Sequence, residues 1–174
     1  MKTLSLFMLF FLISDLMAFE ITSTAFENKE NIPSIYTCDG EDISPPLNWK
    51  SLPEKTKSLV LIVDDPDAPD PRNPRMTWVH WVVYDIPATR GSFPEKVPAN
   101  IAIKGGGIQG KSDFKRPGYG GPCPPIGKHR YFFKLYALDT LLNLAGGKTK
   151  KEIKKAMKGH VLEKVELIGL YRKK

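Results

Sequence analysis

The sequence predicts a single, mainly β domain, and three observations support this. Three runs are mostly apolar on both faces and rich in β-branched and aromatic residues, as in strands buried on both faces: Ser58–Val63, Thr77–Tyr84 and Arg130–Leu138. Fifteen prolines and fourteen glycines fall in clusters, which favours a loop-rich fold over a helical bundle. A length of 174 residues suits one well-buried domain. We therefore expect a sheet covered on both faces, or a sandwich.

Weaker patterns predict the remaining strands. Phe19–Phe26 is expected to form the first strand, and Asn100–Lys104 a less certain one in the middle of the chain. Val165–Tyr171 is expected to form the last strand. No internal repeat or low-complexity linker divides the chain, so these strands belong to one domain.

One helix is expected, from Thr149 to about His160. Thr149 is followed three residues later by Glu152, which is the pattern of a capping box. His160 falls in register with the apolar positions of this helix, so it is interpreted as a core-facing or helix-end histidine. The many lysines of the segment are interpreted as its solvated face.

The N-terminus has the layout of a secretory signal peptide. Lys2 precedes ten uncharged residues, Leu4–Ile13, and a small residue follows at Ala18. The apolar run is too short to span a membrane. The cleavage site itself is poorly defined, and an uncleaved N-terminal anchor is the alternative. We expect residues 1–18 to be removed, leaving residues 19–174 as a secreted or periplasmic domain without stable membrane insertion.

Cys38 and Cys123 are the two cysteines of the chain. An even number of cysteines in an exported protein predicts a disulfide, and two separate buried thiols are the alternative. The bridge would join the segment after Tyr36 to the proline-rich loop Pro122–Pro125. That loop leads into His129, so the disulfide would brace this part of the chain.

Ionisable and aromatic side chains gather at or inside the three strongest strands. Charge at the mouth of an apolar strand is costly to bury without a partner, so these positions predict a binding site. Two of the three histidines of the chain are among them. The residues are Asp65, Asp67, Trp78, His80, His129 and Tyr131.

Strand alternation predicts which of these side chains meet. Within its strand, His80 is expected on the same face as Val82. His129 is expected to share a face with Tyr131, with Arg130 on the opposite face. If the two strands lie in one sheet, the histidines and the tyrosine line a single concavity.

The chemistry of this concavity favours recognition of an anion. Imidazoles donate hydrogen bonds to anion oxygens, and more strongly when they are protonated. Asp65 or Asp67 can fix a histidine tautomer or accept from a ligand amine, and the alternative is that they only hold a turn. The wall Gly120–Pro125 is rigid and lets backbone N–H groups approach a ligand.

Other chemistries fit the sequence less well. Gly105–Ser112 matches the phosphate-loop pattern GxxxxGK[ST], but the residues after it, Asp113–Gly121, cannot form the helix that such a loop needs. The chain has no GxSxG nucleophile motif. The aspartates and histidines are suitable metal donors but lack ligand spacing, so no metal is expected. The net charge of +7 is interpreted as a solvated lysine-rich surface, with no nucleic-acid partner.

Six strings, in order and at consistent separations, resemble the phosphatidylethanolamine-binding protein family, in particular its bacterial and archaeal branch. The resemblance covers essentially the whole chain after the signal peptide. It implies a mainly antiparallel β-sandwich with few peripheral helices. It also implies a small pocket near the surface that binds phosphate-like anions or phosphoethanolamine head groups. The strings are Tyr36–Gly40, Ile43–Trp49, Asp65–Pro69, Trp78–Trp81, Gly118–Pro125 and His129–Tyr131.

The resemblance also implies which residues line the pocket, with Asp67 supporting the aspartate loop. Eukaryotic members place a tyrosine of a C-terminal helix at the pocket rim. This chain is expected to end in a strand, so Tyr171 is not assigned that role. The implied lining residues are Asp65, Trp78, His80, Gly121, Pro122, His129 and Tyr131.

The expected function is that of a non-enzymatic binding protein, without a cofactor, for a small phosphorylated or anionic ligand. The family also includes inhibitors of kinases and of proteases. The alternative is therefore an inhibitor of a protease that acts through a protein–protein surface. A weak phosphoester hydrolase that uses the histidines and aspartates is a third hypothesis.

Overall fold

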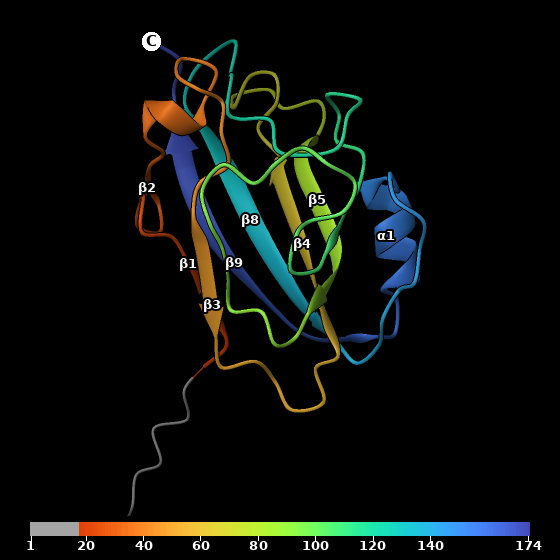
Figure 1. Cartoon of the computed structure of the whole chain (residues 1–174). Helices are drawn as coiled ribbons and strands as arrows, with labels where there is room; N and C mark the ends of the chain where they lie inside the picture. Colours follow the sequence, from red (N-terminus) through yellow and green to blue (C-terminus); the bar gives the residue numbers. More distant parts are fainter. Residues whose placement is uncertain (1–17) are drawn as a thin grey trace, which may run out of the picture.

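Two β-sheets and one α-helix organise residues 18–174, the part of the chain that the computed structural model describes (Figure 1). The expected signal peptide lies outside these residues, apart from Ala18. Within residues 18–174, no helix is long and apolar enough to cross a membrane. The mainly β fold class predicted from the sequence is confirmed.

The larger sheet has the strand order β2-β9-β8-β4-β5-β7, and the smaller one has the order β1-β3-β6. Neighbouring strands are antiparallel except for β2 and β9. The strands are β1 (Glu20–Thr22), β2 (Glu30–Asn31), β3 (Leu47–Lys50), β4 (Ser58–Asp65), β5 (Trp78–Pro87), β6 (Ser92–Phe93), β7 (Ile108–Gln109), β8 (His129–Leu138) and β9 (Val161–Tyr171), and the helical segments are η1 (Ser34–Tyr36) and α1 (Lys150–Ala156).

The main core lies between the two sheets. Trp49 of β3 and Phe93 of β6 pack edge to face, with ring centroids 5.3 Å apart, and Trp81 of β5 lies 5.7 Å from Phe93. Aromatic pairs of this kind add to the free energy gained from burial alone. The smaller sheet therefore covers one face of the central strands.

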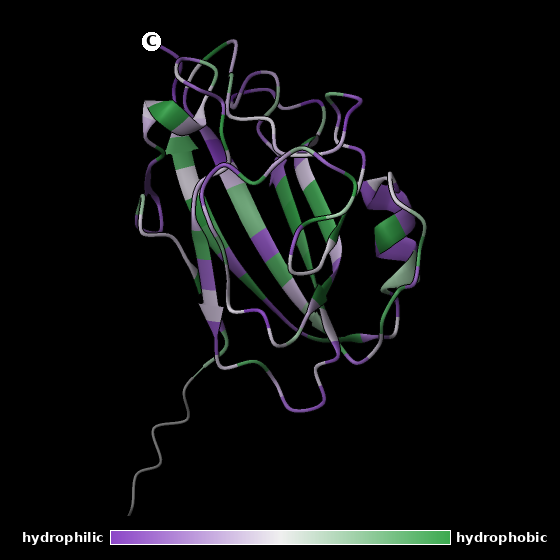
Figure 2. Ribbon diagram, viewed as in Figure 1, coloured by the Kyte–Doolittle hydropathy of each residue, from purple (hydrophilic) through white to green (hydrophobic). Residues whose placement is uncertain are grey.

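Helix α1 covers the opposite face of the larger sheet. Ile153 of α1 and Met157, the residue after its last turn, pack with Val60 and Ile62 of β4 in a second apolar cluster. Figure 2 shows hydrophobic and hydrophilic segments alternating along α1, as expected for a helix with one buried side. The predicted burial of both faces of the central strands is confirmed.

Asp64, near the end of β4, is fully buried on the α1 side of the sheet. Its carboxylate accepts from Lys134 Nζ of β8 at 2.6 Å and from Lys150 Nζ at the start of α1. A buried carboxylate without such partners would cost several kcal/mol. The two lysines therefore tie α1 and β8 to the end of β4.

Most of the predicted elements are present, with shifted ends. The capping box is confirmed, because Thr149 Oγ1 accepts from Glu152 N and the Glu152 carboxylate accepts from Thr149 N. The helix ends at Ala156, short of His160, and Gly159 takes a left-handed conformation (φ 85°) in the turn that follows. His160 is exposed rather than core-facing, and its Nδ1 lies 2.9 Å from Asp139 Oδ1.

Three strand predictions were wrong in extent. Asn100–Lys104 forms only an isolated bridge, from Ala102 to Ile108, and the predicted first strand shortens to β1. The last strand is longer than predicted, because β9 pairs with β8 from Val161 onward. Whether an edge segment forms a strand depends on its pairing with the neighbouring strand. Its own sequence therefore predicts poorly where the strand begins and ends.

A bulge in β5 interrupts the expected alternation of side chains. Opposite the step from Val63 to Asp64 on β4, the pairing on β5 moves by two residues, from Trp81 to Val79. The residue between them, His80, is therefore extra, as in a β-bulge. Bulges re-aim side chains, and they are common beside binding sites.

The bulge makes the predicted face of His80 wrong. The His80 ring lies 5.2 Å from the Tyr131 ring, and Tyr131 belongs to the core between the two sheets. Val82, predicted to share the face of His80, packs instead in the cluster under α1. Without the extra residue, His80 would have pointed away from Tyr131.

The predicted disulfide between Cys38 and Cys123 is present, with the two Cα atoms 5.4 Å apart. The two segments are also joined by a hydrogen bond from Cys38 N to Pro122 O of 3.1 Å. The bridge closes a loop of 85 residues, which restricts the unfolded chain. It therefore fixes the proline-rich loop onto the segment that follows η1.

We predict that the Cys38→Ser/Cys123→Ser double variant loses about 4 kcal/mol of unfolding free energy, because the unfolded chain is no longer cross-linked. Urea denaturation with and without a reductant measures this. The reductant should shift the midpoint of the wild type and leave that of the double variant unchanged. Equal midpoints for oxidised wild type and double variant would contradict the prediction.

Candidate binding pocket

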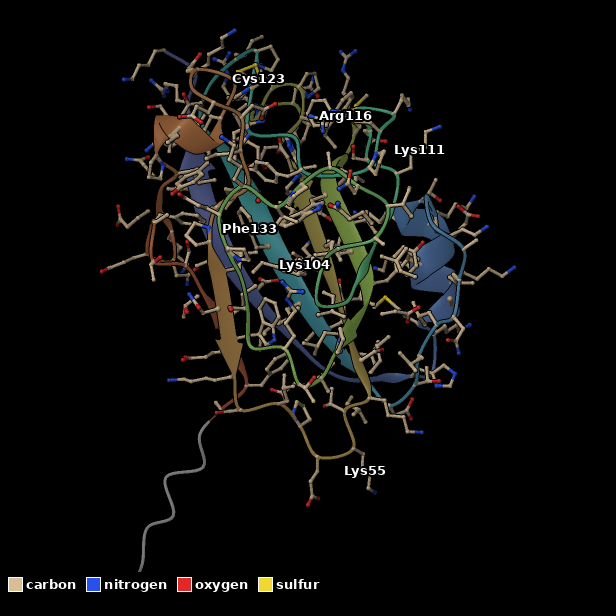
Figure 3. The ribbon with its side chains drawn as sticks, in the orientation of Figure 1. Lys55, Lys104, Lys111, Arg116, Cys123 and Phe133 are labelled. Carbon is tan, nitrogen blue, oxygen red and sulfur yellow. A yellow bond between two sulfur atoms is a disulfide. The ribbon has the colours of Figure 1, made fainter. Side chains whose placement is uncertain are left out.

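A cavity of about 250 Å³ lies where β4 ends and where β5 and β8 begin. Strands β4, β5 and β8 are neighbours in the larger sheet, so these ends meet at one edge. Figure 3 shows Cys123, one of the lining residues, among the loops at this end of the molecule. The cavity is lined by Asp65, Ala68, Pro69, Met76, Trp78, His80, Phe114, Cys123, Pro124, Pro125, His129 and Tyr131.

Asp65 and His129 form a buried pair in the floor of the pocket. His129 Nδ1 lies 2.7 Å from Asp65 Oδ2, and His129 Nε2 lies 3.0 Å from the carbonyl oxygen of Ile126. Both ring nitrogens thus face acceptors, and only an imidazolium can donate to both. Protein groups therefore hold both ring nitrogens of His129, and neither is left free for a ligand.

Asp67 lies behind the pocket and anchors the loop that follows β4. Its N–H donates to Asp65 Oδ1 at 2.8 Å. Its carboxylate accepts from the backbone N, Nε and Nη2 of Arg130, at 3.0, 2.8 and 2.7 Å. The hydrogen bonds from the Arg130 side chain are the main reason that the pKa of Asp67 lies below its ordinary value. Asp67 thus supports Asp65 without lining the cavity.

His80 lies in the pocket with one ring nitrogen free. Its Nδ1 is 2.6 Å from the carbonyl oxygen of Gly120, so the proton on Nδ1 is donated there. Burial lowers the pKa of His80, although the bond to Gly120 and the charge of Asp65 act in the opposite direction. His80 is therefore neutral at pH 7, and its Nε2 carries an unshared lone pair.

Tyr131 carries the one buried side-chain oxygen or nitrogen in residues 18–174 that has no hydrogen-bond partner. The side chain is only 1% exposed, and it lines the cavity between His80 and His129. Burial, helped by the charge of Asp65, raises the pKa of Tyr131 well above its ordinary value. The phenol therefore keeps its proton and offers an unused O–H donor to the pocket.

Aromatic rings form the wall opposite the aspartate loop. Phe114 packs edge to face on both Trp78 and His80, with centroid distances of 5.6 Å in each pair. A Cβ atom at Gly120 would come within 2.4 Å of the Phe114 ring, so a glycine is required there for the ring to lie against the pocket. The wall is therefore apolar next to the polar floor.

Five of the residues predicted to line the pocket do line it, but Gly121 and Pro122 do not. Gly121 N donates to Asp42 Oδ1, and Pro122 O accepts from Cys38 N, so both residues face the segment after η1. Cys123, Pro124 and Pro125 form the wall in their place. The residues that line the pocket as predicted are Asp65, Trp78, His80, His129 and Tyr131.

Sequence reasoning missed three contributors to the pocket region. Arg130 was placed on the face away from the site, yet its side chain holds Asp67. Met76 and Phe114 line the cavity from loops that carried no pattern. The only signal for Phe114 in the sequence was an aromatic residue close to the glycine-rich segment Gly118–Gly121.

Metal binding has little geometric support in this pocket. Residues 18–174 contain no group of three histidine, cysteine or carboxylate side chains placed to hold an ion. Cys123 is in the disulfide, and Asp65 and His129 bond to each other. The free polar atoms are instead the Tyr131 hydroxyl and His80 Nε2.

The fold resembles two solved crystal structures. One is a phosphatidylethanolamine-binding protein homolog from Chlamydia trachomatis, with a TM-score of 0.82 and 41% identity, covering 90% of this chain and 99% of that chain. The other is YbcL from Escherichia coli, described as a new member of the mammalian PEBP family, with a TM-score of 0.78, 31% identity and the same coverage.

Sequence comparisons agree with the structural ones. A UPF0098 protein from Methanothermobacter thermautotrophicus is 52% identical over 149 residues, which cover 86% of this chain and 95% of that protein. A UPF0098 protein from Aquifex aeolicus is 49% identical over 160 residues, which cover 88% of each chain. The family model described as phosphatidylethanolamine-binding protein matches residues 22–172. The chain therefore belongs to the phosphatidylethanolamine-binding protein family, as the sequence motifs predicted.

Proposed function

We propose that this chain is a non-enzymatic binding protein whose pocket takes a phosphate-like anion, such as the head group of phosphoethanolamine. The observation that carries the proposal is the Tyr131 hydroxyl, which is buried in the cavity without a partner. A buried donor left unsatisfied costs about 1–3 kcal/mol. A ligand oxygen that accepts from Tyr131 would remove this cost.

His80 offers a second contact to the same anion. Its ring lies 5.2 Å from the Tyr131 ring, so one tetrahedral group can reach both side chains. A phosphate oxygen near Nε2 favours protonation of His80, and the protonated ring then donates a charge-assisted hydrogen bond. Asp65 and His129 are bonded to each other, so neither is free to take this contact.

The apolar wall suits the rest of such a ligand. Trp78 and Phe114 place aromatic rings beside the polar floor. Aromatic faces attract ammonium groups and also pack against methylene groups. A phosphoethanolamine group has both of these next to its phosphate.

The same geometry supports binding without turnover. Both ring nitrogens of His129 are held by protein acceptors, and Nδ1 of His80 is held by Gly120. The thiol of Cys123 is used in the disulfide. His80 Nε2 is the one imidazole nitrogen of the pocket left free, and the lining has no serine, threonine or free thiol that it could activate as a nucleophile.

We further propose that the protein acts outside the cytoplasm, in the periplasm or the medium. The disulfide fits an oxidising compartment, and the signal-like N-terminus fits export. Mass spectrometry of the protein from fractionated cells tests this. Recovery of the chain in the exported fraction, starting near Phe19, is expected, and recovery of the full-length chain in the cytoplasm alone would contradict it.

We predict that Tyr131→Phe lowers the affinity for phosphoethanolamine about tenfold, or about 1.4 kcal/mol, in calorimetry. The same change should leave the unfolding free energy of the ligand-free protein unchanged or higher, because it removes an unsatisfied buried hydroxyl. Lower affinity without lower stability is the expected signature of a ligand-binding group.

The matched control is Tyr119→Phe. The Tyr119 hydroxyl donates to Tyr36 O at 3.0 Å and does not line the pocket. Removing it should lower stability by about 1 kcal/mol and leave affinity unchanged. If Tyr131→Phe behaves like this control, or if the wild type binds no phosphate-bearing ligand, the proposed function is wrong.

We predict that affinity for sulfate, a tetrahedral anion that does not titrate near neutral pH, rises as pH falls from about 8 to 6. Burial lowers the pKa of His80 in the free protein, and a bound anion raises it, so binding takes up a proton. The affinity gained from protonated His80 is complete below the pKa of His80 in the free protein. It is lost as the pH rises above the pKa of His80 in the complex.

His80→Asn is the matched variant for this measurement. An asparagine amide can still donate to Gly120 O, as Nδ1 does, but it has no group at the place of Nε2. NMR titrations at several pH values should show a smaller pH dependence for the variant. The same dependence in both proteins would show that another group titrates.

A further inference from the structure

We propose that a second groove, between α1 and the loop after β7, binds a soluble ligand that carries several linked phosphate groups. The groove has a volume of about 400 Å³ and shares no lining residue with the pocket described above. It therefore does not depend on the proposed function of that pocket.

Lysines dominate the lining of this groove. They come both from the loop after β7 and from α1, so both segments contribute positive charge to the groove. Asp113 is the single carboxylate of the lining. Its Oδ2 already accepts from Val79 N at 2.8 Å. The lysines are Lys111 and Lys115 from the loop and Lys150, Lys151 and Lys154 from α1.

Four of these lysines have no anionic partner. Lys150 neutralises the buried Asp64, but Lys111, Lys115, Lys151 and Lys154 form no ion pair within residues 18–174. Like charges gathered around one concavity repel each other and raise the local positive potential. A polyanion in the groove relieves this repulsion.

The residue types of the lining are suited to phosphate groups. The lining contains lysines and no arginine. A lysine ammonium binds phosphate as a point charge, without requiring the paired hydrogen-bond geometry of an arginine. Hydroxyl-bearing residues, Thr77 and Ser112, also lie in the lining.

The spread of the lysines favours several linked phosphates over a single one. One exposed ion pair contributes only about 0–1 kcal/mol in water. A single phosphate that contacts one or two ammonium groups would bind weakly for this reason. Phosphates linked in one chain can contact lysines of both segments at once, so their contributions combine within a single binding event.

The test is calorimetric titration with tripolyphosphate at low ionic strength, where exposed charges are least screened. The groove variant is Lys111→Gln/Lys115→Gln/Lys154→Gln, which leaves the Lys150–Asp64 pair intact. The matched control is Lys55→Gln/Lys57→Gln/Lys104→Gln, which removes the same net charge from exposed positions that do not line the groove. Figure 3 shows Lys55 at the end of the molecule opposite Lys111.

We expect the groove variant to lose about tenfold or more in affinity, and the control variant to lose less than about twofold. The other pocket is itself proposed to take a phosphate-like anion, so the titrations are made in the Tyr131→Phe background, in which that pocket is weakened. Orthophosphate should bind more weakly to the groove than tripolyphosphate. No binding of tripolyphosphate by the Tyr131→Phe protein, or equal losses in the two triple variants, would overturn the proposal.

Discussion

The fold around the pocket depends on two adjacent carboxylates at the end of a buried strand. Asp64 and Asp65 are both buried, and their side chains point to opposite faces of the sheet. A carboxylate in such a place requires positively charged partners. Asp64 obtains them from Lys134 and Lys150, and Asp65 obtains its partner from His129. One pair of residues thereby fixes α1 on one side and the pocket floor on the other.

The other residues of the pocket hold Asp65 and His129 in place and leave one hydrogen-bond donor, the Tyr131 hydroxyl, without a partner. Asp67 and Arg130 hold the loop that carries Asp65, and the disulfide holds the proline wall. The bulge turns His80 toward Tyr131, beside the Asp65–His129 pair. The polar groups of the pocket therefore satisfy one another, except for the Tyr131 hydroxyl and His80 Nε2. A buried hydrogen-bond donor without a protein partner is a group that a bound ligand would satisfy.

Much of this could be predicted from the sequence, since it rests on local patterns. The apolar run before Asp64, the capping box at Thr149 and the paired cysteines are each read from neighbouring residues, and each was confirmed. The face of His80 could not be predicted, because a bulge changes the period of two and depends on pairing with β4. The position of Phe114 depends on loop packing against Gly120, which no local rule describes.

The central claim is that Tyr131 and His80 together hold a tetrahedral anion. A crystal structure of the protein grown with phosphoethanolamine tests it most directly. We expect density for the phosphate in the cavity, with one oxygen in hydrogen-bond contact with Tyr131 Oη and another near His80 Nε2. A cavity filled only by water, with the Tyr131 hydroxyl bonded to that water and no phosphate beside His80, would contradict the account.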